Sequence, residues 1–191
     1  MLKQCITGSL YYLRYETHLL QNVFSSSAIC IQMIEALKFY SYADSARFSR
    51  NMYVRDSLHG ERRAKVLAYC LLPQEYHILL KQDSDDGIYQ TIKRTHESIT
   101  RYYNSLFKQT GRIFNPNTAR IEYIYPELQT YTARQIEELP MMAFQGTWKS
   151  YPWSSYHTSK RSLLDQPIQV DLTSRGFGAA YKRAGNIKKY S

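Results

Sequence analysis

The chain has 191 residues, enough for one ordinary domain with tails and too few for two full-sized domains. It carries 25 Lys and Arg against 16 Asp and Glu, for a formal net charge of +9, and its 43% of hydrophobic residues excludes wholesale disorder. The apolar runs are too short to cross a membrane, and we expect no secretory signal, because residues 1–5 lack an apolar stretch. Three widely spaced cysteines fit neither a zinc site nor a disulfide framework. We therefore expect a protein of the cytoplasm, or of an equivalent reducing compartment such as an organelle matrix, whose basic charge and 18 tyrosines favour nucleic acid as a partner.

The first third of the chain predicts one strand, one helix and a loop. Residues 9–15 form a β-prone run, and apolar residues then recur at steps of three and four up to Tyr40, which indicates a helix. Ser25–Ser27 supply N-cap candidates for that helix. Residues 41–63 are polar and arginine-rich without a clear period, so we predict a long loop there.

The middle of the chain predicts a hairpin followed by the longest helix. Residues 66–72 and 76–81 are typical of paired strands with a turn at Pro73–Gln74, and the continuously apolar first arm indicates a central place in a sheet. The acidic run at 83–86 predicts the capped start of a helix, and Gly111 predicts its end. The apolar face of this predicted helix consists of Ile88, Ile92, Ile99, Tyr103 and Leu106.

The remaining elements define the fold class. A strand is predicted at 120–125, and a helix from Glu127 to about Leu139, before Pro140. Together these elements predict an α+β fold, namely a ferredoxin-like antiparallel sheet with helices on one face. We expect this domain at residues 1–160 and a basic C-terminal extension at 161–191.

Several motifs resemble those of the single-tyrosine HUH transposases, and most closely the REP-associated branch of that family. Residues 67–80 read Leu-Ala-Tyr-Cys-Leu-Leu-Pro-Gln-Glu-Tyr-His-Ile-Leu-Leu, and the family hairpin reads Ala-Tyr-Cys-Leu-Met-Pro-Asn-His-apolar-His followed by leucines. Residues 151–156, Tyr-Pro-Trp-Ser-Ser-Tyr, are similar to a recurrent C-terminal signature. The resemblance is strong over 65–114 and patchy as far as residue 156.

The resemblance implies a divalent metal, held by two histidines on one strand face, that polarises the scissile phosphate. In this chain the first histidine position is Glu75 and the second is His77. A carboxylate can bind magnesium, so the implied metal site is altered by this change. The alternative is that Glu75 is a solvated turn residue and His77 an ordinary half-buried strand histidine.

The resemblance also implies a tyrosine nucleophile on a later helix. The matching run is Arg134–Pro140, and the tyrosine position within it is Gln135, whose amide cannot form a phosphotyrosine intermediate. Tyr131 lies one helical turn earlier and could substitute, or could instead pack in the core or stack on a partner. Changes at both the metal and the nucleophile positions predict an inactive enzyme without a cofactor, with Mg²⁺ or Mn²⁺ needed only if nicking survives.

Basic residues on the predicted central helix and in the extension are candidates for phosphate contacts, the alternative being a solvated helix face. The aromatic residues Tyr102, Tyr103, Trp148, Tyr151 and Trp153 can stack on unpaired bases, although Trp153 and Tyr156 fit core or hinge positions better. The candidate nucleic-acid-binding residues are Lys93, Arg94, Arg101, Lys108, Arg112, Arg175, Lys182, Arg183, Lys188 and Lys189.

These observations predict a catalytically inactive, transposase-derived protein that binds structured RNA or a DNA hairpin. Order in the basic extension would require a large anionic partner, so we favour a component of a ribonucleoprotein such as a ribosome, with no membrane partner. Two alternatives remain open. One is an active DNA-nicking enzyme that uses Glu75, His77 and Tyr131. The other is a protein-only scaffold, which would expose apolar rather than cationic patches.

Overall fold

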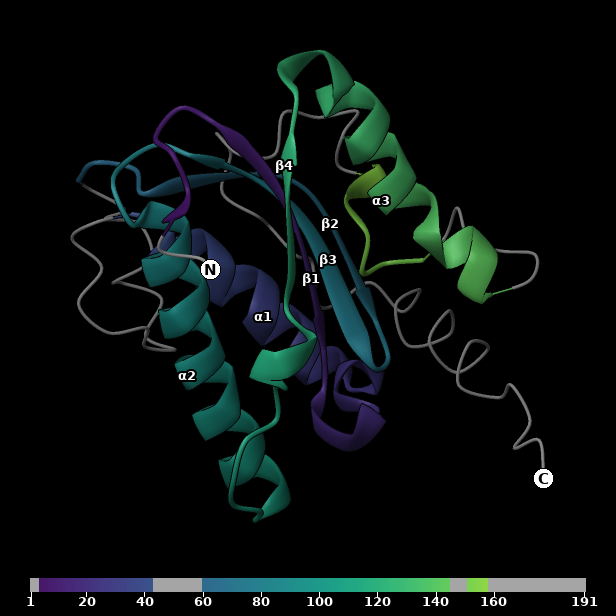
Figure 1. Cartoon of the computed structure of the whole chain (residues 1–191). Coiled ribbons are helices and arrows are strands. Elements are labelled where there is room, and N and C mark those ends of the chain that lie inside the picture. The colour runs from purple at the N-terminus through teal and green to yellow at the C-terminus, as the bar shows by residue number, and fades with distance from the viewer. Residues whose placement is uncertain (1–3, 43–59, 145–150, 158–191) are drawn as a thin grey trace.

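The computed structural model describes residues 4–42, 60–144 and 151–157, and every structural statement below refers to them. Four strands form one antiparallel sheet in the order β2-β3-β1-β4, and three α-helices accompany it (Figure 1). The strands are β1 (Leu10–Glu16), β2 (Ala64–Leu72), β3 (Glu75–Gln82) and β4 (Arg120–Ile124), and the helices are α1 (Ser27–Tyr40), α2 (Gly87–Phe107) and α3 (Gln129–Ala143).

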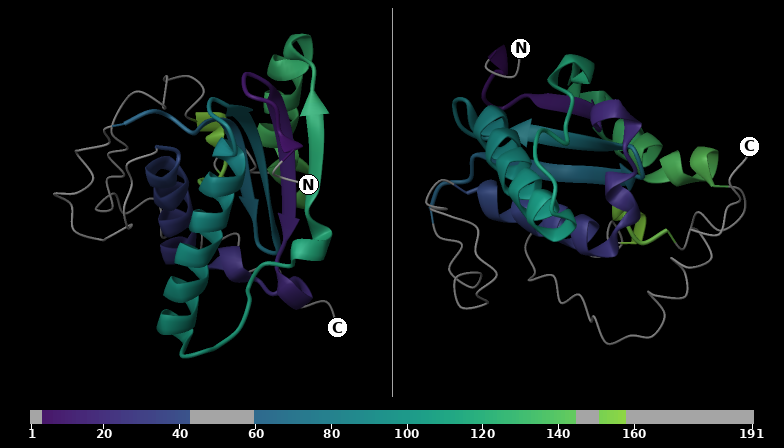
Figure 2. Two further views of the ribbon diagram at one scale, coloured as in Figure 1. Left: turned by 60° about the vertical axis from the view of Figure 1, so that its left-hand side comes forward. Right: turned by 90° about the horizontal axis from the view of Figure 1, so that it is seen from below.

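The sheet lies between two layers of helices. Helices α1 and α2 pack together on one face, and α3 lies on the other side, against β2 and β3 (Figure 2). The predicted α+β fold with an antiparallel sheet is confirmed, and α3 adds a cover on the second face. The central strand β3 needs a cover on both faces of the sheet, because its side chains are buried on both. Tyr76 and Ile78 are fully buried on one face and Leu79 on the other.

The main core fills the space between the sheet and the α1–α2 layer. Leu13 of β1 is fully buried there, with tyrosines before and after it on the same strand face. Helix α2 turns Ile88, Ile92 and Ile99 into this layer, as the apolar period of the sequence predicts. Leu106, predicted on the same apolar face, is instead 48% exposed, because this end of α2 extends beyond the sheet (Figure 1).

The start of α2 differs from the prediction of an acidic cap. Asp86 occupies the N-cap position with φ of +57° and makes no side-chain capping bond. The buried Gln82 takes this role, because its Oε1 accepts a hydrogen bond from the Ile88 N–H at 3.2 Å. Asp83 instead pairs with Arg62. Asp83 of the acidic run therefore stabilises the contact between the segment before β2 and the segment before α2, and the run does not cap the helix.

The C-terminal ends of α2 and α3 differ from their predicted positions at Gly111 and before Pro140. Helix α2 stops before Gly111, because Lys108 adopts a left-handed conformation (φ +51°) and its N–H bonds the Asn104 carbonyl. Helix α3 continues through Pro140 for one further short stretch. A proline this close to a helix end removes one backbone bond without breaking the helix.

Gly87 lies where two backbone segments meet. A Cβ atom at this position would be 1.9 Å from the carbonyl oxygen of Arg63. That carbonyl also accepts hydrogen bonds from the N–H groups of Asp83 and Ser84. Only glycine allows α2 to begin this close to the entry of β2.

Several predictions fall outside the described residues. Most of the long loop predicted at 41–63 does so, as do Trp148 and every basic candidate from Arg175 to Lys189. The division into residues 1–160 and 161–191 stays a prediction. In the described part of the chain, no helix has the length and apolar character needed to cross a membrane.

Candidate functional site

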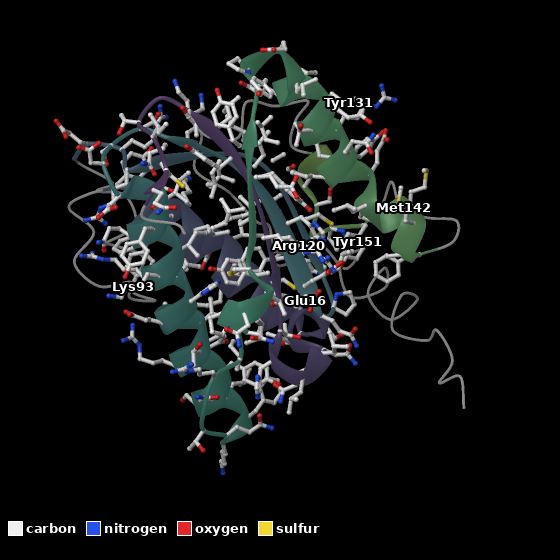
Figure 3. The ribbon with its side chains drawn as sticks, viewed as in Figure 1. Glu16, Lys93, Arg120, Tyr131, Met142 and Tyr151 are labelled. Atoms are coloured by element: carbon white, nitrogen blue, oxygen red, sulfur yellow. The ribbon has the colours of Figure 1, made fainter. Side chains whose placement is uncertain are left out.

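The second face of the sheet carries a group of polar side chains from two neighbouring strands. Because side chains alternate along a strand, Tyr12, Arg14 and Glu16 of β1 point to the same face as Glu75 and His77 of β3. The antiparallel register sets Arg14 opposite His77 and Glu16 opposite Glu75. We call these five residues the β1–β3 polar cluster. Its Glu16 is labelled in Figure 3, near Arg120 of β4.

The cluster is joined by short polar contacts. The Tyr12 hydroxyl lies 2.7 Å from His77 Nδ1, and His77 Nε2 lies 3.1 Å from Glu75 Oε1. Arg14 Nε donates to Glu75 Oε2 at 2.7 Å, and the same guanidinium lies 3.0 Å from Glu16. The Nε2 contact is close but lies off the direction of a good hydrogen bond, so its attraction is mainly electrostatic.

These contacts set the charge states of the cluster. The pKa of Glu75 is lowered to about 2, chiefly by its contact with His77 and also by Arg14, against the opposing effect of burial. Burial raises the pKa of Tyr12 to about 12. Because an ionised carboxylate only accepts, a proton on His77 Nε2 faces Glu75, and Nδ1 is then available to accept from the Tyr12 hydroxyl.

The surroundings of the cluster are net negative. Strand β4 adds Arg120 opposite Arg14, and Glu122 opposite Tyr12. Next to the cluster, the described charged side chains of β1, β3 and β4 are then two arginines and three glutamates, the latter being Glu16, Glu75 and Glu122, whereas Lys65 and Lys81 lie on the same face at the other end of the β2–β3 pair. A phosphate group entering here would meet an excess of carboxylates, which opposes its binding.

The donor set does not fit the divalent metal that the family resemblance implies. Arg14 already occupies the Glu75 carboxylate, and its positive charge repels a second cation. His77 presents one nitrogen to Tyr12 and the other to Glu75. In the described ranges, no group of three or more His, Cys, Asp or Glu is placed to hold a metal ion.

The surroundings of Glu75 and His77 differ from the expected solvated turn residue and half-buried strand histidine. Glu75 is not a solvated turn residue, since it lies on β3 with its side chain only 22% exposed and ion-paired. His77 is buried rather than half-buried. The sequence could not reveal Tyr12 and Arg14 as their partners, because the contacts span more than 60 positions and depend on strand register. The one available signal was the alternation of polar side chains at positions 12, 14 and 16.

Tyr12, His77 and Glu75 stand in the order hydroxyl, imidazole, carboxylate, which is the order of an activated nucleophile with its base and orienting group. Two features oppose that chemistry. The raised pKa keeps the Tyr12 phenol protonated, and the negative surroundings repel phosphate.

The structure does not bring the other two aligned residues into this cluster. Tyr131 is 63% exposed near the start of α3, so it does not pack in the core, and Figure 3 shows it far from Glu16. Gln135, one turn further along α3, is also exposed. The substitute-nucleophile hypothesis for Tyr131 therefore has no support in this geometry.

The basic candidates of α2 lie on the opposite side of the sheet. Lys93 and Arg101 are exposed on the helix, as are Lys108 and Arg112 just beyond it, while Arg94 is partly buried. Lys93 Nζ also lies 5.8 Å from the ring centroid of Tyr89. The structure thus gathers these cations along one helix and separates them from the β1–β3 polar cluster.

The C-terminal signature joins α3 to β2. Tyr151 and Trp153 are buried, and the Trp153 carbonyl accepts a hydrogen bond from the Leu71 N–H at 2.8 Å. Ser155 donates to the Glu137 carboxylate at 2.9 Å, and burial raises the pKa of that carboxyl. The preference for core positions is correct for Trp153, and neither Tyr151 nor Trp153 is available to stack on bases.

This architecture, a four-stranded antiparallel sheet with two helices on one face and a third on the other, has a counterpart among solved structures. It is similar to the REP-associated tyrosine transposase in its complex with a REP hairpin, at a TM-score of 0.53 and 14% sequence identity, over 85% of this chain and 87% of that one. The chain thus has a transposase-like fold.

A candidate transposase from Deinococcus radiodurans R1 is 15% identical, with a TM-score of 0.40, over 71% of this chain and 93% of that one. No family model matches the chain, and no curated protein does.

Proposed function

We propose that this protein binds a nucleic-acid hairpin through phosphate contacts and does not cleave it. The observation that carries the proposal is the charge of one segment. Between Glu97 and Glu122 the chain has Arg101, Lys108, Arg112 and Arg120 and no acidic residue. We call residues 98–121 the acid-free segment.

The acid-free segment presents its cations at the surface. Arg101, Lys108 and Arg112 are exposed, and none of them forms an ion pair among the described residues. Cations without nearby carboxylates keep their full attraction for a phosphate backbone, and each one that neutralises a phosphate releases a counterion. This supports a polyanion as the ligand of α2.

Two features, one on α3 and one on the second sheet face, argue against cleavage. Gln135 stands where the family resemblance implies the nucleophile, and an amide cannot form the covalent intermediate. Arg14 and Tyr12 engage Glu75 and His77, the two residues at the implied metal positions. Binding and chemistry would have to occur on opposite sides of the sheet.

The choice of a hairpin rests on the comparison of folds. The similar REP-associated tyrosine transposase is bound to a REP hairpin. A place in a larger ribonucleoprotein such as a ribosome is the finer part of the proposal, in which the basic residues from Arg175 to Lys189 supply a second set of phosphate contacts.

Salt titration of hairpin binding tests the proposal. We expect the full chain to bind a fluorescein-labelled DNA or RNA hairpin with an affinity that falls steeply with salt. Replacing Lys93, Arg94 and Arg101 with alanine removes up to three cations from the binding face. The logarithmic salt slope should therefore fall by roughly 0.7–0.9 for each phosphate that is no longer neutralised.

The matched control removes three cations elsewhere, namely Lys65 and Lys81 at one end of the β2–β3 pair and Arg134 of α3. An equal change of slope in the control would assign binding to net charge alone. Absence of binding by the unmodified protein would refute the proposal.

Nicking through Tyr12 is the second candidate, favoured by its 2.7 Å contact with His77. The assay incubates the protein with single-stranded DNA hairpins and Mg²⁺ or Mn²⁺ and looks for a denaturation-resistant adduct. Our proposal expects none. An adduct abolished by Tyr12→Phe but not by Tyr131→Phe would establish this candidate instead.

A further inference from the structure

The end of α2 exposes apolar side chains where the helix extends beyond the sheet. Leu106 is 48% exposed and Phe107 45% exposed, although both are large hydrophobic residues. Figure 1 shows this end of α2 reaching past the strand ends, and Figure 2 shows the same in a second view. The core does not account for their position, because the sheet does not reach this far.

The aromatic groups here form an ordered pair. The rings of Tyr103 and Phe107 lie with centroids 4.6 Å apart and planes inclined by 44°. Their spacing of four residues places them on one face of the helix. The two rings therefore contact each other in the structure without a ligand.

The turn that follows is also fixed. Lys108 takes a left-handed conformation, and the Asn104 carbonyl accepts from its N–H and from the Gln109 N–H. The Asn104 side-chain amide donates to the Gly111 carbonyl at 2.9 Å. These bonds return the chain across the helix end and set the positions from which Lys108 and Arg112 extend.

The charged residues nearest to the pair along the chain are all positive. Arg101 and Lys108 flank Phe107 in the sequence, Arg112 follows the turn, and Glu97 lies ten residues before Phe107. At 1.5 Å per helical residue, that glutamate is about 15 Å away along the axis. An apolar surface that docked another protein would not need a rim free of carboxylates, whereas a nucleic acid would.

We propose that this helix end, consisting of Tyr103, Phe107, Arg101, Lys108 and Arg112, is a binding site for an unpaired nucleobase. Phe107 stacks on the base, Tyr103 supports its ring, and the three cations contact the adjacent phosphates. The proposal rests on the proposed function and extends it, because it assigns the hairpin loop, or a strand flanking the stem, to a particular aromatic side chain.

The test uses the full chain and DNA hairpins that carry 2-aminopurine either in the loop, in the flanking strand or in the stem. Stacking of the probe base on Phe107 should change the fluorescence of the loop or flanking probe, while the stem probe should stay unchanged. Phe107→Ala should abolish that change and weaken binding about tenfold, within the range for removal of one stacking side chain. The salt slope should stay the same.

Three variants separate the possible outcomes. Phe107→Trp should retain both the affinity and the signal. Phe107→Leu, which keeps apolar area without a ring, should lose both, so retention by leucine would indicate an apolar docking site and overturn the proposal. Tyr131→Ala removes an even more exposed aromatic residue (63%, against 45% for Phe107) from α3 and should have no effect.

Different results would refute hairpin binding and the stacking site at Phe107. If the unmodified protein binds no hairpin, the proposed function is refuted. If it binds with a normal salt slope and Phe107→Ala changes neither the affinity nor the probe signal, only the stacking site is refuted. Because Phe107 is partly exposed and contacts Tyr103, its replacement should leave the circular dichroism spectrum unchanged and lower the thermal midpoint by only a few degrees.

Discussion

Replacing Glu75 with glutamine tests how strongly the β1–β3 polar cluster stabilises the fold. The folded protein lowers the pKa of Glu75 from 4.5 to about 2. A difference of about 2.5 between two pKa values corresponds to at most about 3.4 kcal/mol in the free energy of unfolding. The side chain keeps 22% exposure, so solvent screens part of this attraction. We expect Glu75→Gln to cost about 1–2 kcal/mol at pH 7.

The direction of the pH dependence follows from the sign of the shift. Because the folded-state pKa is depressed, the unfolded chain binds the proton more readily between pH 4.5 and about 2. The contribution of Glu75 is therefore fully present above pH 4.5 and is lost as the pH falls towards 2. The Glu75→Gln variant has no such contribution to lose.

Urea unfolding at a series of pH values measures the effect. The difference in unfolding free energy between the unmodified protein and Glu75→Gln should shrink steadily below pH 4.5. Glu61→Gln, at an exposed position next to β2, serves as the control and should show almost no difference at any pH. A difference that persists undiminished at low pH would show that glutamine disturbs packing rather than charge, and would refute this reasoning.

Three further results are expected. Gly87→Ala should lower stability by about 1–3 kcal/mol in thermal melts, because its Cβ would collide with the Arg63 carbonyl, while Gly8→Ala should cost about 1 kcal/mol from its positive φ alone. Deleting residues 172–191 should weaken binding to the nucleic-acid partner and leave the melting temperature of the domain nearly unchanged. Restoring Glu75→His and Gln135→Tyr together should produce no strand-cleaving activity while Arg14 and Tyr12 stay in place, and a covalent adduct from that variant would contradict our account of the site.

The elements that the sequence predicted well are those defined by local patterns. The β2–β3 hairpin and the buried stripe of Ile88, Ile92 and Ile99 follow from hydrophobic periodicity within short windows. The observed ends of these elements differ from the predicted ends where the backbone conformation sets them. Lys108, for example, ends α2 in a left-handed conformation that its helix propensity does not indicate.

The candidate site was less predictable because its contacts are long-range. Glu75 and His77 were found by comparison with a motif, yet their partners Tyr12 and Arg14 lie on a strand that precedes them by more than 60 positions. Register between β1 and β3 decides which side chains meet, and one residue of slippage would send Tyr12 to the opposite face. The exposure of Phe107 was not predicted for another reason, since an apolar residue at a helix end is normally assigned to the core.

The C-terminal signature also determines how the sheet behaves towards other copies of the chain. Unpaired backbone groups on an edge strand invite pairing with a second strand, which is a common route to aggregation. At the outer edge of β2, the bridge between Cys70 and Ser154 and the hydrogen bond from Leu71 to Trp153 occupy part of that edge. Residues 151–157 thus cover part of the β2 edge, and we expect a chain truncated before Tyr151 to expose this edge and to self-associate.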